Sequence, residues 1–397
     1  MRDRADRGTQ RASSRPAIWR APGLGALAFA LTLAVSLTMV GIVGGSAGAS
    51  STFLGGVGAV STVASTVPAN GDVNPYGVAV IPTSVGQLVA GNVLVSNFNN
   101  NPNLGSAGNL QGTGTTIVEV SPGGVQTVFA HIDPNGDAGR DCGGVGLTTA
   151  LVVLRSGWVV VGSLPTTDGT AATATAGCLF VLDSSGTVVR VIHNKTINGP
   201  WDMTALDQGN RAVLFVTNVL NDTVAAAGNV VNNGTVVRIT LSMHDHHAPR
   251  VRHETVIGSG FAERTDPGAL VIGPTGVALA PDETLYVADT LTNRIAAIPD
   301  ALDRHHSAHT GADVSANGAL MGPLGLSLAP NGDILTVNAQ DGNIVETTPS
   351  GAQVATKTLD NNGNPPGAGA LFGLAVAPNT TSLYFVDDAT NTLNLLH

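Results

Sequence analysis

Short apolar runs separated by turns of Gly, Pro, Asn and Asp make up most of this chain. The stretch from Pro274 to Ile298, PTGVALAPDETLYVADTLTNRIAAI, contains three such runs around a Pro-Asp turn. Runs of this kind, rich in Val, Leu and Ile and bounded by turn residues, predict β-strands. Little of the sequence has a strong apolar period of 3.6 residues, so we expect few helices.

The same pattern recurs along the chain, with close relatives of this stretch starting at Pro323 and Leu371. Six units can be aligned on strands A, B, C and D, in which strand A begins at a turn that usually contains Gly. The aligned positions are Gly77, Gly146, Asp202, Gly276, Gly325 and Gly373. The last two spacings are 49 and 48 residues, and the wider ones before them come from insertions between strands B and C. A repeat of this size predicts an array of similar sheets.

The sixth unit ends at His397 after its strand C, which would leave a sheet edge unpaired. The segment 57–66, VGAVSTVAST, precedes the first unit and could supply the missing strand. The fold we expect is therefore all-β, a six-bladed β-propeller of four-stranded antiparallel blades, closed by an N-terminal strand added to the last blade. An open β-solenoid and a pair of sandwiches are the alternatives, and the orphan strand favours the closed ring.

The repeated motif, P-x-G-hydrophobic-A followed by LYVAD-x-x-x-N-x-I, resembles the NHL repeat, most closely between Pro274 and Ile298. The resemblance covers nearly all of the chain after the N-terminal segment and implies an NHL-type six-bladed propeller. The wider group includes streptogramin lyases, peptidylglycine amidating lyases, gluconolactonase-like hydrolases and many binding proteins without enzymatic activity. Because the motif reflects blade packing, it is informative about fold and weak about function.

Residues 1–49 differ from the rest of the chain. Six arginines precede an apolar run from Leu24 to Val43, and Ala47-Gly48-Ala49 has the small-x-small form of a cleavage site. This order is typical of a secretory signal peptide, so we expect a secreted protein with a propeller domain at 57–397. The apolar run is also close to the length that spans a bilayer, so retention as a membrane anchor is the alternative.

Charge and cysteine content narrow the possible partners. Without residues 1–49, Lys plus Arg falls from 18 to 12 and Asp plus Glu from 28 to 26, which leaves a formal charge of −14. An acidic surface repels nucleic acid and anionic lipid, so we exclude nucleic-acid binding. Separately, we expect the protein to be a monomer. Cys142 and Cys178 are the two cysteines, and in an exported chain they predict one disulfide.

In a propeller the D–A and B–C connections lie on one face, here called the loop face, and the A–B and C–D turns lie on the other, the turn face. Strand B of each unit ends toward the loop face, mostly with Asn or Asp. These strand ends are Asn97, Ser163, Asn218, Asp289, Asn338 and Asp387. One interpretation is turn chemistry, because Asn and Asp side chains bond nearby backbone amides. The other is a polar ligand cup or a Ca²⁺ site, because carboxylate and amide oxygens suit that ion.

Unit three departs from the repeat, with Asp202 where other units have Gly and with Trp201 before it. Departures of this kind often mark functional sites, and we expect Asn198, Trp201 and Asp202 to face the loop-face end of the channel. Asn198-Gly199 resembles the Asn-Gly that serves as a metal ligand in gluconolactonase-like proteins. The acidic ligand of that family has no clear counterpart here.

Two functions follow from these patterns. The first is an exported module that binds a small polar ligand, a glycan or a protein on the loop face; its candidate binding residues are Asn74, Asn97, Asn198, Trp201, Asn218 and Asn338. The alternative is a metal-dependent lactonase or lyase in the central channel, with Asp202 as general base. In that case a calcium ion would be held by Asp289, Asp387, Asn218 and Asn198. No histidine starts a strand A or ends a strand B, which argues against a lyase that works through histidine.

Overall fold

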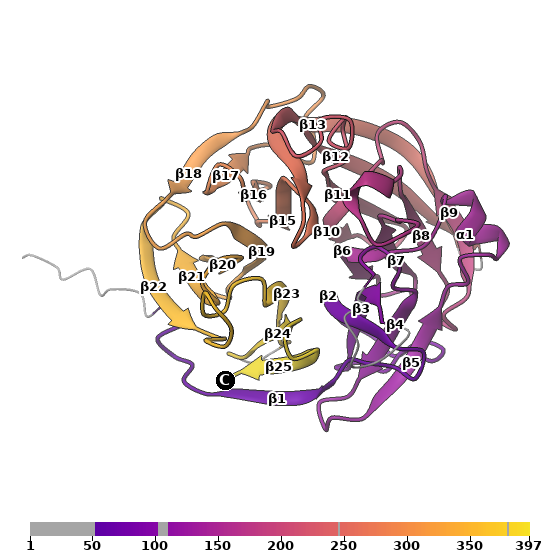
Figure 1. The fold of residues 1–397 in the computed structure, drawn as a ribbon, viewed down its shortest axis with the longest axis horizontal. Helices are drawn as coiled ribbons and strands as arrows, with labels where there is room; N and C mark the ends of the chain where they lie inside the picture. Colours follow the sequence, from indigo (N-terminus) through magenta and orange to yellow (C-terminus); the bar gives the residue numbers. More distant parts are fainter. Residues whose placement is uncertain (1–51, 102–109, 245–246, 379–380) are drawn as a thin grey trace, which may run out of the picture. The chain divides into compact units, whose positions relative to one another are not determined.

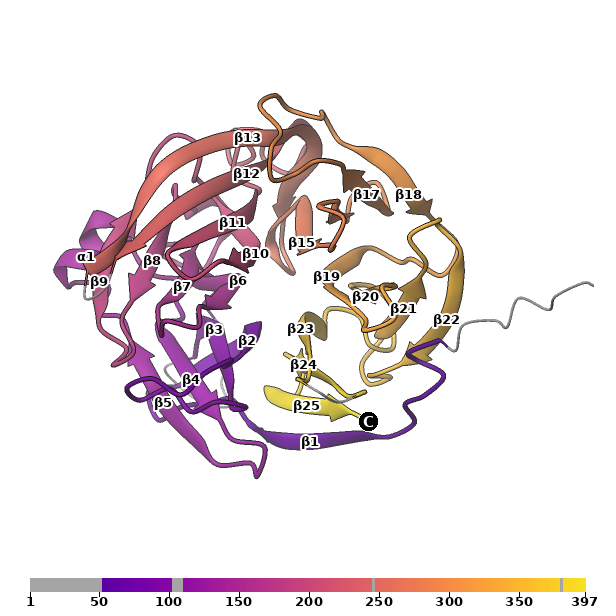
Figure 2. The ribbon, with the colours of Figure 1, turned by 180° about the vertical axis from the view of Figure 1, so that it is seen from behind.

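The computed structural model describes residues 52–101, 110–244, 247–378 and 381–397. The chain divides into the units Met1–Ala49 and Ser50–His397, and the predicted signal peptide lies outside the described residues. In the described part, six antiparallel sheets stand around a common axis (Figure 1). The predicted six-bladed propeller is therefore confirmed, and the view from behind shows the same ring (Figure 2).

Each blade runs from an inner strand A to an outer strand D, in the order that the repeat predicted. Blade 1 contains β2 (Asp72–Val80), β3 (Val93–Asn100), β4 (Thr116–Val120) and β5 (Gln126–His131). Blade 2 contains β6 (Leu147–Val153), β7 (Val159–Ser163), β8 (Cys178–Leu182) and β9 (Val188–Ile192). Blade 3 contains β10 (Pro200–Asp207), β11 (Arg211–Asn218), β12 (Val231–His244), β13 (His247–Asp266) and the short β14 (Leu270–Ile272).

The last three blades are shorter and more regular. Blade 4 contains β15 (Pro274–Leu279), β16 (Leu285–Asp289), β17 (Arg294–Ile298) and β18 (Ala312–Ala316). Blade 5 contains β19 (Pro323–Leu328), β20 (Ile334–Asn338), β21 (Asn343–Thr347) and β22 (Gln353–Thr358). Blade 6 contains β23 (Leu371–Val376), β24 (Leu383–Asp387) and β25 (Thr392–Leu396), and β1 (Val60–Ser65) is its outer strand.

The core lies between neighbouring blades, which explains why the middle strands are apolar throughout. Every residue of β16 and β20 is buried, because both faces of each sheet pack against another blade. Between blades 2 and 3, for example, Leu179 of β8 belongs to one apolar cluster with Leu214 of β11 and Ile239 of β12. The outer strand β22 instead alternates between exposed and half-buried residues, as expected for a strand with one face in water.

The ring is closed by both ends of the described chain. Strand β1 pairs antiparallel with β25 from Val60 opposite Leu396 to Ser65 opposite Thr392, as the orphan segment predicted. The segment before β1 continues onto blade 5, where the backbone N–H groups of Phe53 and Leu54 donate to the Glu346 carboxylate at 2.7 and 2.8 Å. Phe53, Leu54 and Val57 are buried, so this segment contributes to the core as well as to the sheet.

Blade 2 differs from the predicted alignment. Leu147 opposes Ser163 at the end of strand B, just as Pro75 opposes Asn97 in blade 1. Gly146 therefore precedes strand A. Pairing resumes at Leu151 opposite Val161, as it does at Val78 opposite Val95 in blade 1, so the residue that corresponds to Gly77 is Ala150. The alignment on Gly146 was wrong because β6 carries a wider irregularity than the other inner strands, between Leu147 and Leu151.

Regular helix is scarce among the described residues, as predicted. They contain one short α-helix, α1 (Asp137–Asp141), and one 3₁₀ turn, η1 (Ala171–Thr173). No helix in the described ranges is long and apolar enough to cross a membrane. Helix α1 leads directly into Cys142, which forms the predicted disulfide with Cys178 at the start of β8. The bond ties the segment before strand A of blade 2 to strand C, next to the inserted loop between β7 and β8.

Removing the closing strand should open the ring. A chain that starts at Val67 loses β1 and the buried residues before it, so we expect its melting temperature to fall by about 10 °C or more relative to a chain that starts at Ser50. Circular dichroism gives the melting temperature, and size-exclusion chromatography should show self-association through the freed edge of β25. Equal melting temperatures and a monomeric elution profile would contradict closure by β1.

The disulfide should stabilise the fold measurably. It closes a separation of 36 residues in sequence, and we expect replacement of both cysteines by serine to lower the free energy of unfolding by about 3–4 kcal/mol. Urea denaturation of the oxidised wild type and the double variant gives this difference. The reduced wild type should behave like the double variant, and a reduced wild type as stable as the oxidised one would refute the prediction.

Candidate functional site

The inner strands approach one another closely at a layer of glycines. A Cβ atom on Gly276 would lie 2.2 Å from the carbonyl oxygen of Leu324 in the next blade, and one on Gly325 would lie 1.9 Å from that of Phe372. A Cβ atom on Gly373 would likewise lie 2.2 Å from the carbonyl oxygen of Tyr76 in blade 1. The recurring glycine of strand A is therefore needed because there is no room for a side chain between adjacent inner strands.

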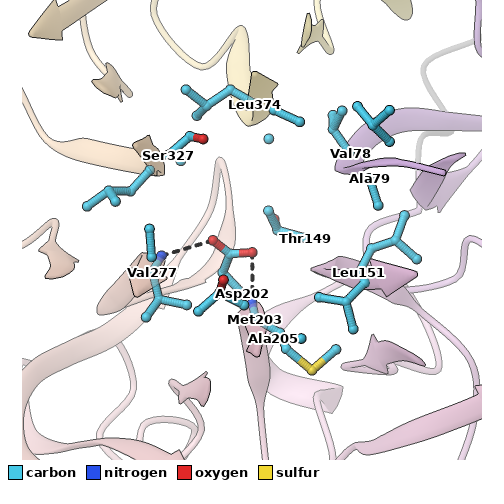
Figure 3. Close-up of a pocket in the computed structure, with 18 of the residues that line it drawn as sticks. Val78, Ala79, Thr149, Leu151, Asp202, Met203, Ala205, Val277, Ser327 and Leu374 are labelled. Carbon is cyan, nitrogen blue, oxygen red and sulfur yellow. Dashed lines mark hydrogen bonds between the residues drawn. The ribbon is translucent and has the colours of Figure 1, made fainter. Parts of the chain in front are cut away.

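At this layer, blade 3 carries Asp202 instead of glycine, and the seam to blade 4 is built differently. The carboxylate Oδ2 accepts a hydrogen bond from the backbone N–H of Val277 on β15 at 3.1 Å, and Oδ1 accepts one from Met203 at 2.8 Å (Figure 3). The backbone N–H of Asp202 in turn donates to the hydroxyl of Thr217 at 3.0 Å. A side-chain carboxylate thus joins two blades where elsewhere backbone packs on glycine.

Asp202 lines a central cavity of about 360 Å³. The wall consists of inner-strand residues from all six blades, running from the glycine layer toward the A–B turns, so the cavity opens on the turn face. Most side chains around it are apolar, including Leu151, Met203 and Leu374 (Figure 3). Among the described residues that line the cavity, Asp202 is the one ionisable side chain.

Aromatic rings fill the axis on the loop-face side of the glycine layer. Tyr76 and Phe372, each one residue before its glycine, stack with ring centroids 3.9 Å apart, and Trp201 lies 6.3 and 6.1 Å from them. The indole N–H of Trp201 donates to the carbonyl of Val271 at 3.2 Å. Trp201 is therefore a packing residue of this aromatic layer, on the loop-face side. Asp202, which we also expected at the loop-face end of the channel, instead lines the cavity that opens on the turn face.

Burial controls the ionisation of Asp202. Its side chain is 9 % exposed, and the loss of hydration raises the pKa of the carboxyl to about 7, although the two backbone N–H donors act to lower it. A carboxyl with this pKa exchanges its proton near neutral pH, as general bases and pH-dependent binding groups do.

The six strand B ends are buried and bonded within their own surroundings. The amide of Asn97 donates to the carbonyl of Thr66 at 3.0 Å, and that of Asn338 donates to Ala319 at 2.9 Å. Asp387 accepts from the backbone N–H of Thr390 at 3.1 Å, and the Ser163 hydroxyl accepts from that of Gly146 at 3.0 Å. Asp387 thus makes the local turn bond that one of the two interpretations expected, whereas the bonds given for the other three reach more distant segments of the chain. The side-chain oxygens of Asn97 and Asn338 are buried without a hydrogen-bond partner, so neither interpretation is decided.

Asp289, Asn218 and Asn198 also have partners close by. Asp289 Oδ2 lies 3.0 Å from the guanidinium of Arg294 in the same blade, and burial raises the pKa of this carboxyl despite that partner. Asn218 Oδ1 accepts from the backbone N–H of Asn198 at 3.3 Å. The four predicted calcium ligands thus belong to three blades, and two of them, Asn198 and Asn218, contact each other.

A buried glutamate that sequence reasoning missed completes the polar network of blade 3. Glu263 on β13 accepts from the backbone N–H of Asn221 at 2.9 Å and from its side chain at 3.2 Å, and Asn221 accepts from Asn198. Glu263 is fully buried, which raises the pKa of its carboxyl to about 8. Nothing in the repeat pattern could have identified it, because β13 extends far beyond the predicted strand D.

A second missed acid contacts the predicted binding residue Asn74. Asp388 Oδ2 accepts from the Asn74 side chain at 2.7 Å, and Asn391 accepts from the Asn74 backbone N–H at 2.7 Å. Burial, and to a lesser degree the neighbouring charge of Asp387, raise the pKa of Asp388 to about 8. Asn74 has a φ of 57°, and these contacts stabilise its left-handed backbone conformation within β2. Asn74 therefore joins blade 1 to blade 6.

These contacts bear on the predicted calcium ion. The described residues contain no group of three or more His, Cys, Asp or Glu that could hold a metal. Asp289 is neutralised by Arg294, and Asp387 is used by its own turn. Two of the four candidate ligands are Asn, so this observation does not test them as a set; calcium binding stays a prediction, and we derive no catalytic step through a metal.

A larger cavity, of about 560 Å³, lies on the loop face. The inserted loops of blades 1, 2 and 3 meet there with the turn between β13 and β14, as the alignment of the insertions predicted. Its wall is formed by Gln111, Gly169, Thr170, Ala171, Ala227, Gly228, Arg264, Thr265, Asp266, Pro267 and Leu270.

Direct contacts hold this cavity together. The Gln111 side chain donates to the carbonyl of Pro267 at 2.8 Å, and the Thr166 hydroxyl donates to the carbonyl of Gln111 at 2.6 Å. Arg264 pairs with Asp266 at 2.7 Å, and both side chains remain partly exposed at 34 and 20 %. The loop face thus presents a preformed hollow with one cation, one anion and several amide and hydroxyl groups.

Solved structures with this architecture include enzymes of the group that the repeat resembles. A luciferin-regenerating enzyme is 12 % identical, with 85 % of this chain and 94 % of that chain aligned and a TM-score of 0.53. A gluconolactonase from Xanthomonas campestris is 13 % identical over 85 and 88 % of the two chains, with a TM-score of 0.52. A virginiamycin B lyase from Staphylococcus aureus is 16 % identical over 85 % of each chain, with a TM-score of 0.47.

At these identities the likeness defines the class of protein, a six-bladed β-propeller, and leaves the activity open. No protein-family model matches the sequence, and neither does any curated protein.

The ionisation of Asp202 should appear as pH-dependent stability. Since the pKa is higher in the folded chain than the ordinary 3.8, the folded state holds the proton more tightly, and stability from this group is lost as pH rises from about 4 to about 7. Asp202→Asn lacks this loss. We expect its stability relative to the wild type to increase over that range, by at most about 4 kcal/mol, and to stay constant above it.

Urea denaturation at a series of pH values measures this difference. Asp282→Asn, the same substitution at an exposed turn position, is the matched control. A change with pH for Asp202→Asn that does not exceed the change for the control would contradict the raised pKa of Asp202.

Proposed function

We propose that this protein is an exported binding propeller that holds a small polar ligand in the loop-face cavity. The observation that carries the proposal is the convergence of three inserted loops and the β13–β14 turn on one hollow of about 560 Å³. Loops positioned by a rigid scaffold are where binding sites usually lie, and this volume is in the range of small-molecule pockets.

The chemistry of the wall favours a polar ligand with both donors and acceptors. The guanidinium of Arg264 can donate to a carboxylate or hydroxyl oxygen, and the Asp266 carboxylate can accept from a hydroxyl or an amine. Among the described wall residues there is no aromatic side chain on which a sugar ring could stack. A compact polar molecule therefore fits better than an extended glycan or a flat protein surface.

Export is part of the same proposal. A buried disulfide between Cys142 and Cys178 is typical of proteins in oxidising compartments, and the basic-apolar-small order of residues 1–49 is that of an export signal. Phe53 and Leu54 dock beside Asn331 in the A–B turn of blade 5, through the shared acceptor Glu346.

The metal-dependent lactonase or lyase is the second candidate, and one observation favours it. Asp202 lines the central cavity with a pKa of about 7, as a general base would. The calcium ligands proposed for it do not gather around Asp202. Calcium binding stays a prediction, and titration of the chelated protein with CaCl₂, read by calorimetry, tests it.

Ligand binding to the loop face should depend on Arg264. We expect at least one member of a panel of glucose, N-acetylglucosamine, citrate, glutamate and lysine to raise the melting temperature of the chain 50–397, because ligands that bind the folded state stabilise it. Arg264→Ala should reduce the affinity at least about tenfold, as loss of a charge-assisted hydrogen bond does.

Arg250→Ala, an exposed arginine toward the other end of the same strand, is the matched control and should bind as the wild type does. Binding that survives in Arg264→Ala would place the ligand elsewhere. No response to any member of the panel would count against a small polar ligand, and hydrolysis of a lactone by the wild type but not by Asp202→Asn would favour the enzyme.

A further inference from the structure

The central cavity is a second potential site, separate from the loop-face cavity. The two share no wall residue, and the aromatic layer of Tyr76, Trp201 and Phe372 lies between the glycine layer and the loop face. The central cavity opens instead among the A–B turns, and Asp202 stands at its inner end (Figure 3). A ligand could occupy it without contact to any of the inserted loops.

The carboxylate of Asp202 can accept more hydrogen bonds than the two that it accepts from backbone N–H groups. Each oxygen has one backbone donor, Met203 for Oδ1 and Val277 for Oδ2. A carboxylate has about four lone-pair sites, so acceptor capacity remains toward the cavity. Because the carboxylate is fixed by bonds to two strands, little conformational entropy would be lost when it binds a donor.

The surroundings of Asp202 favour positive charge and offer nothing to compensate the carboxylate. Strands β6, β7 and β15, which pack against β10, carry no ionisable side chain. The nearest ones along β10 and β11 are Asp207 and Arg211, at the turn-face ends. The A–B turns around the opening add Asp282, Glu283 and Asp333 against Arg155.

The side chains of the cavity wall favour an organic cation over a metal ion. A hard ion such as Ca²⁺ requires six to eight oxygen ligands. The wall offers the Asp202 carboxylate and the three hydroxyl side chains of Thr149, Thr204 and Ser327, which are fewer, and its other side chains are apolar. An alkylammonium ion needs one strong acceptor for its head and an apolar surface for its body. Leu151 and Leu374 are among the apolar residues that provide that surface (Figure 3).

We propose that the central cavity binds a small organic ammonium ion from the turn face, with the charged head on Asp202 and the apolar body along the inner strands. A cation at this position favours the ionised carboxylate. Binding therefore releases the proton that Asp202 holds at lower pH, and affinity rises with pH by about tenfold per unit until the carboxyl of the free protein is ionised, near pH 7.

Calorimetric titration of the chain 50–397 with n-butylamine hydrochloride tests the proposal, at high salt to suppress binding to the acidic surface. The expected result is saturable binding of one equivalent that strengthens between pH 5.5 and 7 and levels off above, with proton release on binding at the lower pH. n-Butanol and sodium butyrate, which share the apolar body and lack the cation, should bind at least about tenfold more weakly.

Variants separate this site from the rest of the molecule. Asp202→Asn keeps the shape of the side chain, and Asp202→Gly restores the residue of most other blades; both should abolish amine binding, and circular dichroism shows which of them remain folded. Glu263→Gln, a buried acid on the loop-face side, and Arg264→Ala should bind the amine normally, so this test does not depend on the loop-face ligand. Binding that persists in the folded Asp202 variants, equal binding of n-butanol, or an affinity independent of pH would each overturn the proposal.

Discussion

The pairing of β1 with β25 is the interaction on which the rest of this molecule depends. Six twisted sheets surround an axis only if the last one is complete and meets the first. Here the outer strand of the last blade comes from the start of the propeller, so both ends of the domain are held by one set of backbone hydrogen bonds. The docking of Phe53 and Leu54 on Glu346 of blade 5 extends this closure to a second blade.

Closure brings the inner strands close together, and this has a consequence for chemistry. Where adjacent strands meet, glycine is required at most seams because a Cβ would collide with the neighbouring backbone. At the seam between blades 3 and 4, the Asp202 carboxylate occupies this layer and bonds to Val277. An ionisable group buried at the axis carries a desolvation cost that no packing requirement explains, since glycine serves at the equivalent seams. Its position in a cavity suggests that the cost is offset by a function.

The two faces of the propeller differ in construction. The loop face has lengthened B–C loops and a cavity with both charges. The buried carboxyl of Glu263 and the half-buried carboxyl of Asp388 stabilise local turns there. The turn face has short turns and gives access to the central cavity. The aromatic layer lies between the two cavities.

The sequence by itself determined the repeat, the strand order, the closing strand, the disulfide and the convergence of the inserted loops. These follow from apolar periodicity, turn residues and the count of strands, all of which are local or additive along the chain. The register of blade 2 was misjudged, because the irregularity around Thr149 leaves no mark in residue types. Asp202 could be singled out as the residue that breaks the repeat.

Only the tertiary structure decided what these residues touch. Which side of the aromatic layer Asp202 faces depends on how six inner strands meet at the axis, and that arrangement joins positions from six separate units of the chain. The same holds for Glu263 and Asp388, whose raised pKa values come from burial by other segments. At the strand ends, the sequence cannot distinguish an Asn or Asp that coordinates an ion from one that hydrogen-bonds within a turn. Their partners in three dimensions, such as Arg294 beside Asp289, come from the structure alone.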